Sequence, residues 1–369
     1  FSMTISAPSM PSNNLVKWVS YNAQQDCVVV SSDNGVRIFN CNPLTEAVTL
    51  TEDQVGSIRI AQVLHRSNII ALVAGGRKPK FAPNTLMLWD EANKRFVAEC
   101  AVQGGPIINV FINSSRLILI QYNRVNIFGL QPLRFFQSTD SGCNPSGIAA
   151  MGGEGQTAVL AYPSIKRGTV QLVALDKVSA EKSKSIPPCV LNAHVGDIAV
   201  MSVNTQGTML ATGSTKGTII RIFDTRTRLP LNELRRGSDP ATLHCVTFSP
   251  CGSYLASSSD KSTVHIFQTR EKKESKWDVR SLYDDAKRSC AQFSLPEDTV
   301  AKLAFVTDEV KGGSVSPNGS NQTTASQMSV VAVSTSGTFH RFSFNKDGLC
   351  ERRAFDHILQ LGSEKDFWT

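Results

Sequence analysis

The chain has 369 residues, of which 41% are hydrophobic and 19% charged, so it can bury a large core and is not a disordered polypeptide. Its 38 basic and 31 acidic residues give a net charge of +7, which fits an anionic partner without identifying one. The longest apolar run, Ile69 to Ala74, is far shorter than the about 20 residues that span a bilayer. We therefore expect any membrane contact to be peripheral.

Short runs of Val, Ile, Phe and Thr alternate with Gly, Ser, Asn and Asp clusters, which is typical of strands and tight turns. The unit is clearest in two copies, at 204–225 and 249–269. Five weaker copies have their C-terminal parts at 31–40, 83–90, 122–130, 164–175 and 334–344. Between the two clearest copies, five residues recur forty-five positions later: Gly207, Leu210, Ser214, Lys216 and Thr218 return as Gly252, Leu255, Ser259, Lys261 and Thr263. Seven units of 40 to 50 residues predict an all-β fold, a seven-bladed β-propeller with four-stranded blades.

The repeats predict one domain over 13–360, preceded by a flexible N-terminus at 1–12. Two stretches exceed the repeat length. Residues 270–288 interrupt the sixth blade, and the Gly/Ser/Asn-rich stretch 311–327 is expected to be a flexible loop.

No catalytic or cofactor motif is visible. The chain lacks a G-x-S-x-G elbow, an H-E-x-x-H pair and a phosphate-binding G-x-x-x-x-G-K-[ST] loop. Nine cysteines without a C-x-x-C pair favour reduced thiols over a disulfide framework or a zinc site. Aromatic residues make up only 7% and form no stripe with basic ones, which argues against nucleic-acid binding. We predict a protein that is not an enzyme and binds no cofactor or metal.

Arg235 and Arg236 lie between the two clearest repeats, where the chain passes from the fifth blade to the sixth. Successive residues of a strand point in opposite directions, so one arginine should face each neighbouring blade. Arginine binds phosphate oxygens through two parallel hydrogen bonds and keeps its charge. The pair predicts two anion sites, although paired arginines at a strand end are more often solvated or bound to an acid such as Glu233.

Leu-Arg-Arg-Gly at 234–237, between LATGSTKGTIIRIFDT and SSSDKSTVHIF, resembles the PROPPIN family of phosphoinositide-binding WD-repeat propellers. The segment 54–90 is similar to the second blade of that family. Leucine before the arginines, and the LHRSN run, are closer to the branch of the third and fourth human WIPI proteins.

This resemblance implies two headgroup pockets. The first would contain His194, Thr212, Ser214, Gly217, Thr218, Arg221 and Arg235. The second would contain Arg236, Gly237, Ser259, Thr263 and His265. Ser262 stands where the family has glycine, which puts the second pocket in question. If both histidines donate to phosphate, binding should strengthen at mildly acid pH.

The insertion 270–288 would be a membrane-contacting loop. Val279, Leu282 and Tyr283 have the spacing of one apolar helical face, with Trp277 beside them, although Asp284 and Asp285 oppose an anionic surface. The resemblance supports this role, because PROPPINs carry a membrane-inserting loop here.

The family implies binding to phosphatidylinositol 3-phosphate and 3,5-bisphosphate, and a cytoplasmic protein peripherally associated with phagophore, autophagosome or endosomal membranes. It also implies a large autophagy lipid-transfer protein as partner, bound through the first three blades, where Asn22 matches a polar position and Gln24 replaces an acid. The alternative is a WD-repeat scaffold that binds proteins only, in which Arg235 and Arg236 form surface salt bridges.

Overall fold

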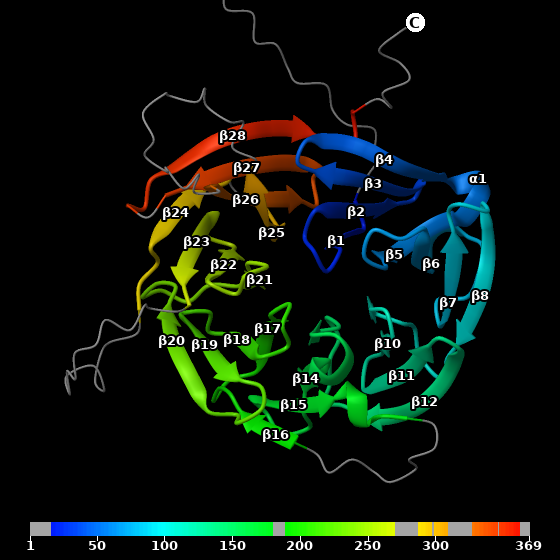
Figure 1. Cartoon of the computed structure of the whole chain (residues 1–369), viewed down its shortest axis with the longest axis horizontal. Coiled ribbons are helices and arrows are strands. Elements are labelled where there is room, and N and C mark those ends of the chain that lie inside the picture. Colours follow the sequence, from blue (N-terminus) through cyan, green and yellow to red (C-terminus); the bar gives the residue numbers. More distant parts are fainter. Residues whose placement is uncertain are drawn as a thin grey trace, which may run out of the picture.

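Seven four-stranded antiparallel sheets surround a central opening in the computed structural model of the chain (Figure 1). The structure describes residues 16–179, 189–269, 287–296, 299–308, 327–345 and 347–361. Each sheet contains four strands that are consecutive in the sequence, with the first strand innermost and the fourth at the rim. The predicted seven-bladed propeller is therefore confirmed.

Blade 1 contains β1 (Trp18–Tyr21), β2 (Cys27–Ser32), β3 (Gly35–Cys41) and β4 (Leu44–Thr51), and blade 2 contains β5 (Gly56–Val63), β6 (Ile69–Pro79), β7 (Thr85–Asp90) and β8 (Arg95–Ala101). Blade 3 contains β9 (Asn109–Ile112), β10 (Arg116–Ile120), β11 (Arg124–Leu130) and β12 (Leu133–Asp140). Blade 4 contains β13 (Ala150–Gly152), β14 (Val159–Pro163), β15 (Thr169–Ala174) and β16 (Cys189–Asn192). A one-turn helix, α1 (Glu52–Val55), joins blades 1 and 2, and two short 3-10 turns, η1 (Gly155–Thr157) and η2 (Leu175–Lys177), belong to blade 4.

Blade 5 contains β17 (Ile198–Val203), β18 (Met209–Ser214), β19 (Ile219–Asp224) and β20 (Pro230–Arg235). Blade 6 contains β21 (Leu243–Phe248), β22 (Tyr254–Ser259), β23 (Thr263–Gln268) and β24 (Ala291–Ser294). Blade 7 contains β25 (Ala301–Asp308), β26 (Gln327–Ser334), β27 (Thr338–Phe344) and β28 (Cys350–His357). The recurring sequence unit is the hairpin of a blade's second and third strands, such as β18–β19 and β22–β23.

The core lies between blades. Buried aliphatic and aromatic residues of the described chain form seven clusters, one at each junction of neighbouring sheets. Alternation along the strands produces this arrangement: in β23, Val264 and Ile266 are buried while His265 between them is half-buried. Each blade thus uses both faces, and polar positions collect near the rim and the turns.

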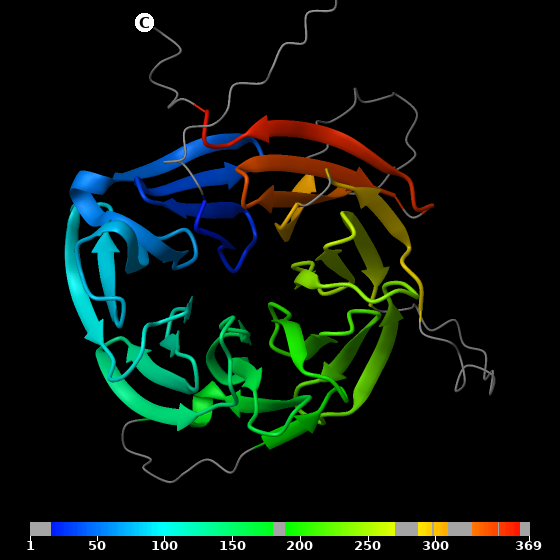
Figure 2. The same cartoon turned by 180° about the vertical axis from the view of Figure 1, so that it is seen from behind.

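The ring closes without a shared sheet, because no sheet combines strands from the two ends of the described chain. Blade 1 packs directly against blade 7, and Figure 2 shows the two lying side by side from behind. Gln25 in the β1–β2 turn reaches further: its Nε2 donates to Phe248 O at 2.7 Å, and its Oε1 accepts from Phe305 N at 2.6 Å. One side chain of blade 1 therefore connects to blades 6 and 7.

All nine cysteines are free, with three buried, four half-buried and two exposed. Within the described ranges no helix has the length and apolarity needed to cross a bilayer.

Candidate functional site

The two adjacent arginines stand at the C-terminal end of β20, the outer strand of blade 5. Leu234 is fully buried in the core between blades 5 and 6. Glu233 and Arg235 pair with Arg221 and Ile219 of β19 and lie on the opposite face, toward blade 4. Arg236 follows on the blade 6 side, near His265 of β23, whose pKa is lowered by burial and, to a smaller extent, by the charge of Arg236.

These arginines have opposite environments. Arg235 is exposed, and its guanidinium makes no hydrogen bond or ion pair with another described residue. Arg236 is only 7% exposed; its Nε donates to Gly217 O at 2.9 Å and its Nη2 donates to Asp239 O. Arg235 is thus available to a ligand, whereas the fold already uses part of Arg236.

His194, Thr212 and Arg221 of the predicted first pocket meet at the junction of blades 4 and 5. The Nε2 atom of His194 lies 3.0 Å from Thr212 Oγ1, and Thr212 pairs with Arg221 across the sheet. Arg221 donates to Glu233 Oε2 and to Ala193 O, both at 2.8 Å.

The same arrangement occurs away from the arginine pair. Arg37 of β3 forms an ion pair with Glu46 of β4 and donates to Leu359 O at 2.9 Å, joining blades 1 and 7. Arg221 therefore has a structural role in joining blades, whatever it contributes to a ligand.

The β18–β19 turn supplies Ser214, Gly217 and Thr218. Neither hydroxyl, of Ser214 or of Thr218, forms a side-chain hydrogen bond within the described chain. Gly217 has a φ of 66°, and a Cβ there would lie 1.8 Å from Ala241 O, so only glycine fits. The carbonyls of Gly217 and Thr218 accept from Arg236, so these first-pocket residues also contact the second arginine.

In the predicted second pocket, unlike the first, both hydroxyl side chains already form hydrogen bonds within the protein. Ser259 Oγ accepts from Lys261 N at 3.4 Å, and Thr263 Oγ1 donates to Lys261 O at 3.3 Å. The Nδ1 atom of His265 lies 3.3 Å from Ser289 Oγ, a contact that sequence reasoning missed because Ser289 lies 24 positions away. Gly237 is open, since a Cβ there would meet nothing within 4 Å.

The fold favours the neutral form of both histidines, His194 and His265. Burial lowers the pKa of His194, and burial together with Arg236 lowers the pKa of His265 to about 4. The expectation that binding strengthens at mildly acid pH stays a prediction, because it depends on how far a bound phosphate raises these lowered pKa values.

Blade 7 contains the same turn pattern without a comparable site. Ser334 Oγ is bonded to Ser336 Oγ at 2.6 Å and to Thr338 Oγ1 at 2.7 Å. His340, at the position of His265, is 2% exposed and lies against Phe355. The connection from blade 6 to blade 7 has Leu295 where the preceding connection has Arg236, and its described residues, 295–296 and 299–300, include no cation. The repeated turn is thus a feature of the fold, and the arginines distinguish blades 5 and 6.

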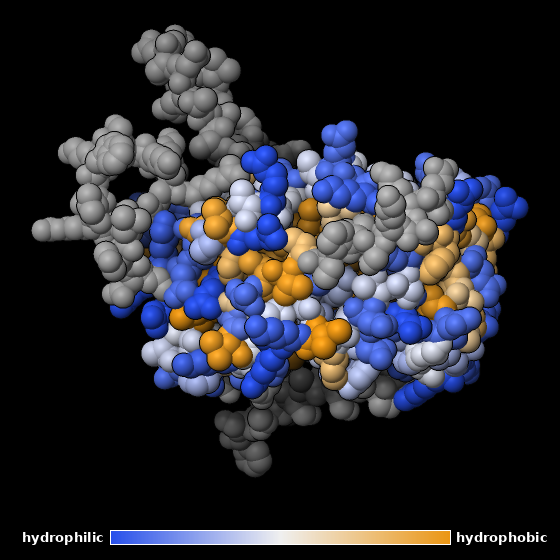
Figure 3. Space-filling view, turned by 90° about the horizontal axis from the view of Figure 1, so that it is seen from below, coloured by the Kyte–Doolittle hydropathy of each residue, from blue (hydrophilic) through white to orange (hydrophobic). Residues whose placement is uncertain are grey.

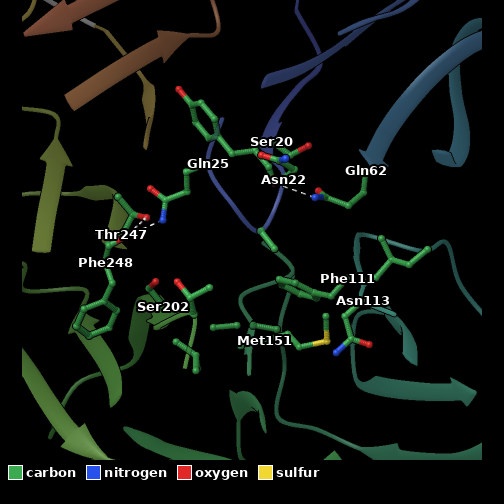
Figure 4. Close-up of a pocket in the computed structure, with 18 of the residues that line it drawn as sticks. Ser20, Asn22, Gln25, Gln62, Phe111, Asn113, Met151, Ser202, Thr247 and Phe248 are labelled. Carbon is green, nitrogen blue, oxygen red and sulfur yellow. Dashed lines mark hydrogen bonds between the residues drawn. The ribbon is translucent and has the colours of Figure 1, made fainter. Parts of the chain in front are cut away.

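A cavity of about 360 Å³ occupies the central opening and is lined by the inner strands of all seven blades (Figure 4). Asn22 borders it but is 2% exposed, and its Oδ1 accepts from Asp26 N and Cys27 N. Asn204 makes the same turn in blade 5. Asn22 therefore shapes its turn, while the exposed Gln24 is bonded to His65.

Trp277, Val279, Leu282 and Tyr283 of the predicted membrane loop lie outside the described residues, as do 1–12 and most of 311–327. The residues that flank the loop are described. Asn232 Nδ2 donates to Thr269 O at 2.5 Å, and Lys287 N donates to Glu233 O at 2.9 Å. Both ends of the insertion are therefore bonded to β20, the strand of Arg235.

Comparisons with known proteins find related sequences and a related structure. The chain is 33% identical over 352 residues to Ectopic P granules protein 6 of Caenorhabditis elegans, covering 92% of this chain and 86% of that protein. It is 25% identical to Autophagy-related protein 18 of Komagataella pastoris, covering 69% of this chain and 51% of that protein. The solved structure of Kluyveromyces lactis Hsv2 has the same fold, with a TM-score of 0.74 at 22% identity over 94% of this chain and 99% of that one. The PROPPIN family model matches residues 17–290, and the chain belongs to the PROPPIN family.

Proposed function

We propose that this protein binds phosphoinositide headgroups at the rim of blades 5 and 6 and docks peripherally on membranes in autophagy. Membership of the PROPPIN family supports this role. The observation that carries the proposal is Arg235: its exposed guanidinium has no partner within the described chain, and two hydroxyls near the end of its strand are also unbonded. A headgroup phosphate needs such charged and neutral donors together.

The first pocket comprises Arg235 with His194, Thr212, Ser214, Gly217, Thr218 and Arg221. The second comprises Arg236 and Gly237 with Ser259, Thr263 and His265. Arg236 donates to two carbonyls, and a guanidinium has five N–H donors, so donors remain for a phosphate. Because its hydroxyls are already bonded, the second pocket should bind more weakly than the first.

The lipids we propose are phosphatidylinositol 3-phosphate and 3,5-bisphosphate on phagophore, autophagosome or endosomal membranes. The role is binding and includes no catalytic step. We also propose a lipid-transfer protein as partner on the edge of blades 1 to 3, following the resemblance to the WIPI branch. Gln24 is exposed there, and the Nε2 atom of His65 lies 3.2 Å from Oε1 of Glu154 in blade 4, so this edge is polar.

Vesicle flotation with phosphatidylinositol 3-phosphate tests the function, using the wild type, Arg235→Thr and a control, Arg134→Thr. Arg134 is an exposed arginine on β12, the outer strand of blade 3, with no partner within the described chain. We expect the wild type and Arg134→Thr to float and Arg235→Thr to float at least tenfold less. Equal flotation of all three, or of none, would reject lipid binding at this site in favour of a protein-binding scaffold.

A further inference from the structure

The strand that ends in Arg235 exposes two leucines at its other end. Leu229 is 62% and Leu231 is 47% exposed, with Pro230 exposed between them. Figure 3 shows apolar residues scattered among polar ones over the rim near β16, so the exposure of an aliphatic residue does not by itself identify a site.

The charges around these leucines are unbalanced. Arg226 and Arg228 are exposed immediately before them, and the Arg228 side chain has no partner within the described chain. The one acid of the segment 224–231, Asp224, accepts from Arg226 N at 3.0 Å, from Thr227 N at 2.6 Å and from Thr227 Oγ1 at 2.9 Å. The segment thus presents cations and leucines, while its carboxylate is engaged in the turn.

This segment is continuous with the proposed headgroup site. Leu231 and Arg235 lie on one strand, about 13 Å apart at the usual rise per residue. Leu231 also lines a hollow of about 390 Å³ together with Thr269, the residue from which the blade 6 insertion departs. A flat anionic surface that lies along β20 can therefore contact the arginine and the leucines together.

We propose that Arg226, Arg228, Leu229 and Leu231 form a second lipid-contacting element. The leucines enter the headgroup region of an anionic bilayer, and the arginines contact lipid phosphates. The inference rests on the proposed function, because headgroup binding at Arg235 brings this strand to the membrane. Burying two half-exposed leucines should raise vesicle affinity about tenfold without changing affinity for a soluble headgroup.

The test compares the full chain with Leu229→Ser/Leu231→Ser and with a control, Val97→Ser, which removes an aliphatic side chain 44% exposed on β8 of blade 2. Calorimetry measures binding of soluble inositol 1,3-bisphosphate. Sedimentation measures partitioning onto vesicles of phosphatidylcholine, phosphatidylserine and phosphatidylinositol 3-phosphate. We expect unchanged headgroup binding in all three proteins, and about tenfold weaker partitioning only in the double-leucine variant.

Wild-type partitioning of the double-leucine variant, with headgroup binding intact, would overturn this inference and leave the proposed function standing. Failure of the wild type to bind the headgroup would overturn both. Contact is measured directly with vesicles that contain brominated phosphatidylcholine. Leu231→Trp should show more quenching than the wild type, whose own tryptophans include Trp277, and Val97→Trp should not. Equal quenching of the two variants would also overturn the inference.

Discussion

The two adjacent arginines at the end of β20, Arg235 and Arg236, have different roles because successive side chains of an extended segment point to opposite sides. Arg235 is exposed on the face toward blade 4, whereas Arg236 turns into the junction with blade 6 and bonds to the backbone there. A variant that neutralises both should lose stability together with the proposed lipid binding. The two residues must therefore be tested separately.

Arg236→Met should lower the free energy of unfolding by about 2–4 kcal/mol, because methionine keeps the apolar stem but leaves the carbonyls of Gly217 and Asp239 without their donors. Urea denaturation of the free protein measures this. Arg235→Met is the control and should change stability by less than about 0.5 kcal/mol, since that side chain is exposed. Equal stability of the two variants would show that the fold does not need the Arg236 guanidinium.

At the scale of elements, the turn between the second and third strands contains a left-handed residue in each of blades 5, 6 and 7. Glycine occupies this position in blades 5 and 7, as Gly217 with a φ of 66° and Gly337 with a φ of 84°. Blade 6 has Ser262 there with a φ of 57°, and its N–H still donates to Ser259 O at 3.2 Å. The serine therefore keeps the glycine turn, at the expense of backbone strain.

Ser262→Gly should stabilise the protein by about 0.5–1 kcal/mol in thermal or urea denaturation, because it removes the strain of the left-handed backbone. The change breaks no hydrogen bond within the described chain, because the Ser262 hydroxyl makes none there. The reverse exchange, Gly217→Ser, should destabilise by more than about 2 kcal/mol, because its Cβ would overlap Ala241 O. A destabilised Ser262→Gly would show that the hydroxyl has a structural role.

At the scale of the whole molecule, closure of the ring depends on packing and on side chains. Blades 1 and 7 share a core but no sheet, and Gln25 adds hydrogen bonds to blades 6 and 7 across the central opening. Gln25 holds a left-handed backbone, with a φ of 63°, to do so. The contact joins parts of the chain that are far apart in sequence and so favours the closed ring.

Gln25→Ala should lower the free energy of unfolding by about 1–3 kcal/mol, because Phe248 O and Phe305 N both lose their partner. Urea denaturation gives the value, and faster limited proteolysis at the junction of blades 1 and 7 gives an independent measure. Gln24→Ala, an exposed neighbour, should cost less than about 1 kcal/mol. If the free energy of unfolding of Gln25→Ala equals that of the wild type, packing alone closes the ring.

The all-β class, the seven repeats and the position of the insertion in blade 6 could be predicted from the sequence, because strand alternation and turn residues are local features. The sequence also placed the arginines between blades 5 and 6. The tertiary structure decided which arginine is exposed, that Asn22 is buried in its turn, and that both ends of the insertion are bonded to β20. These outcomes depend on contacts between distant residues: Arg236 is bonded to a carbonyl 19 positions earlier, and Gln25 to groups 223 and 280 positions away. Burial and hydrogen bonding of that kind exist only once the ring has formed, so no local pattern in the sequence encodes them.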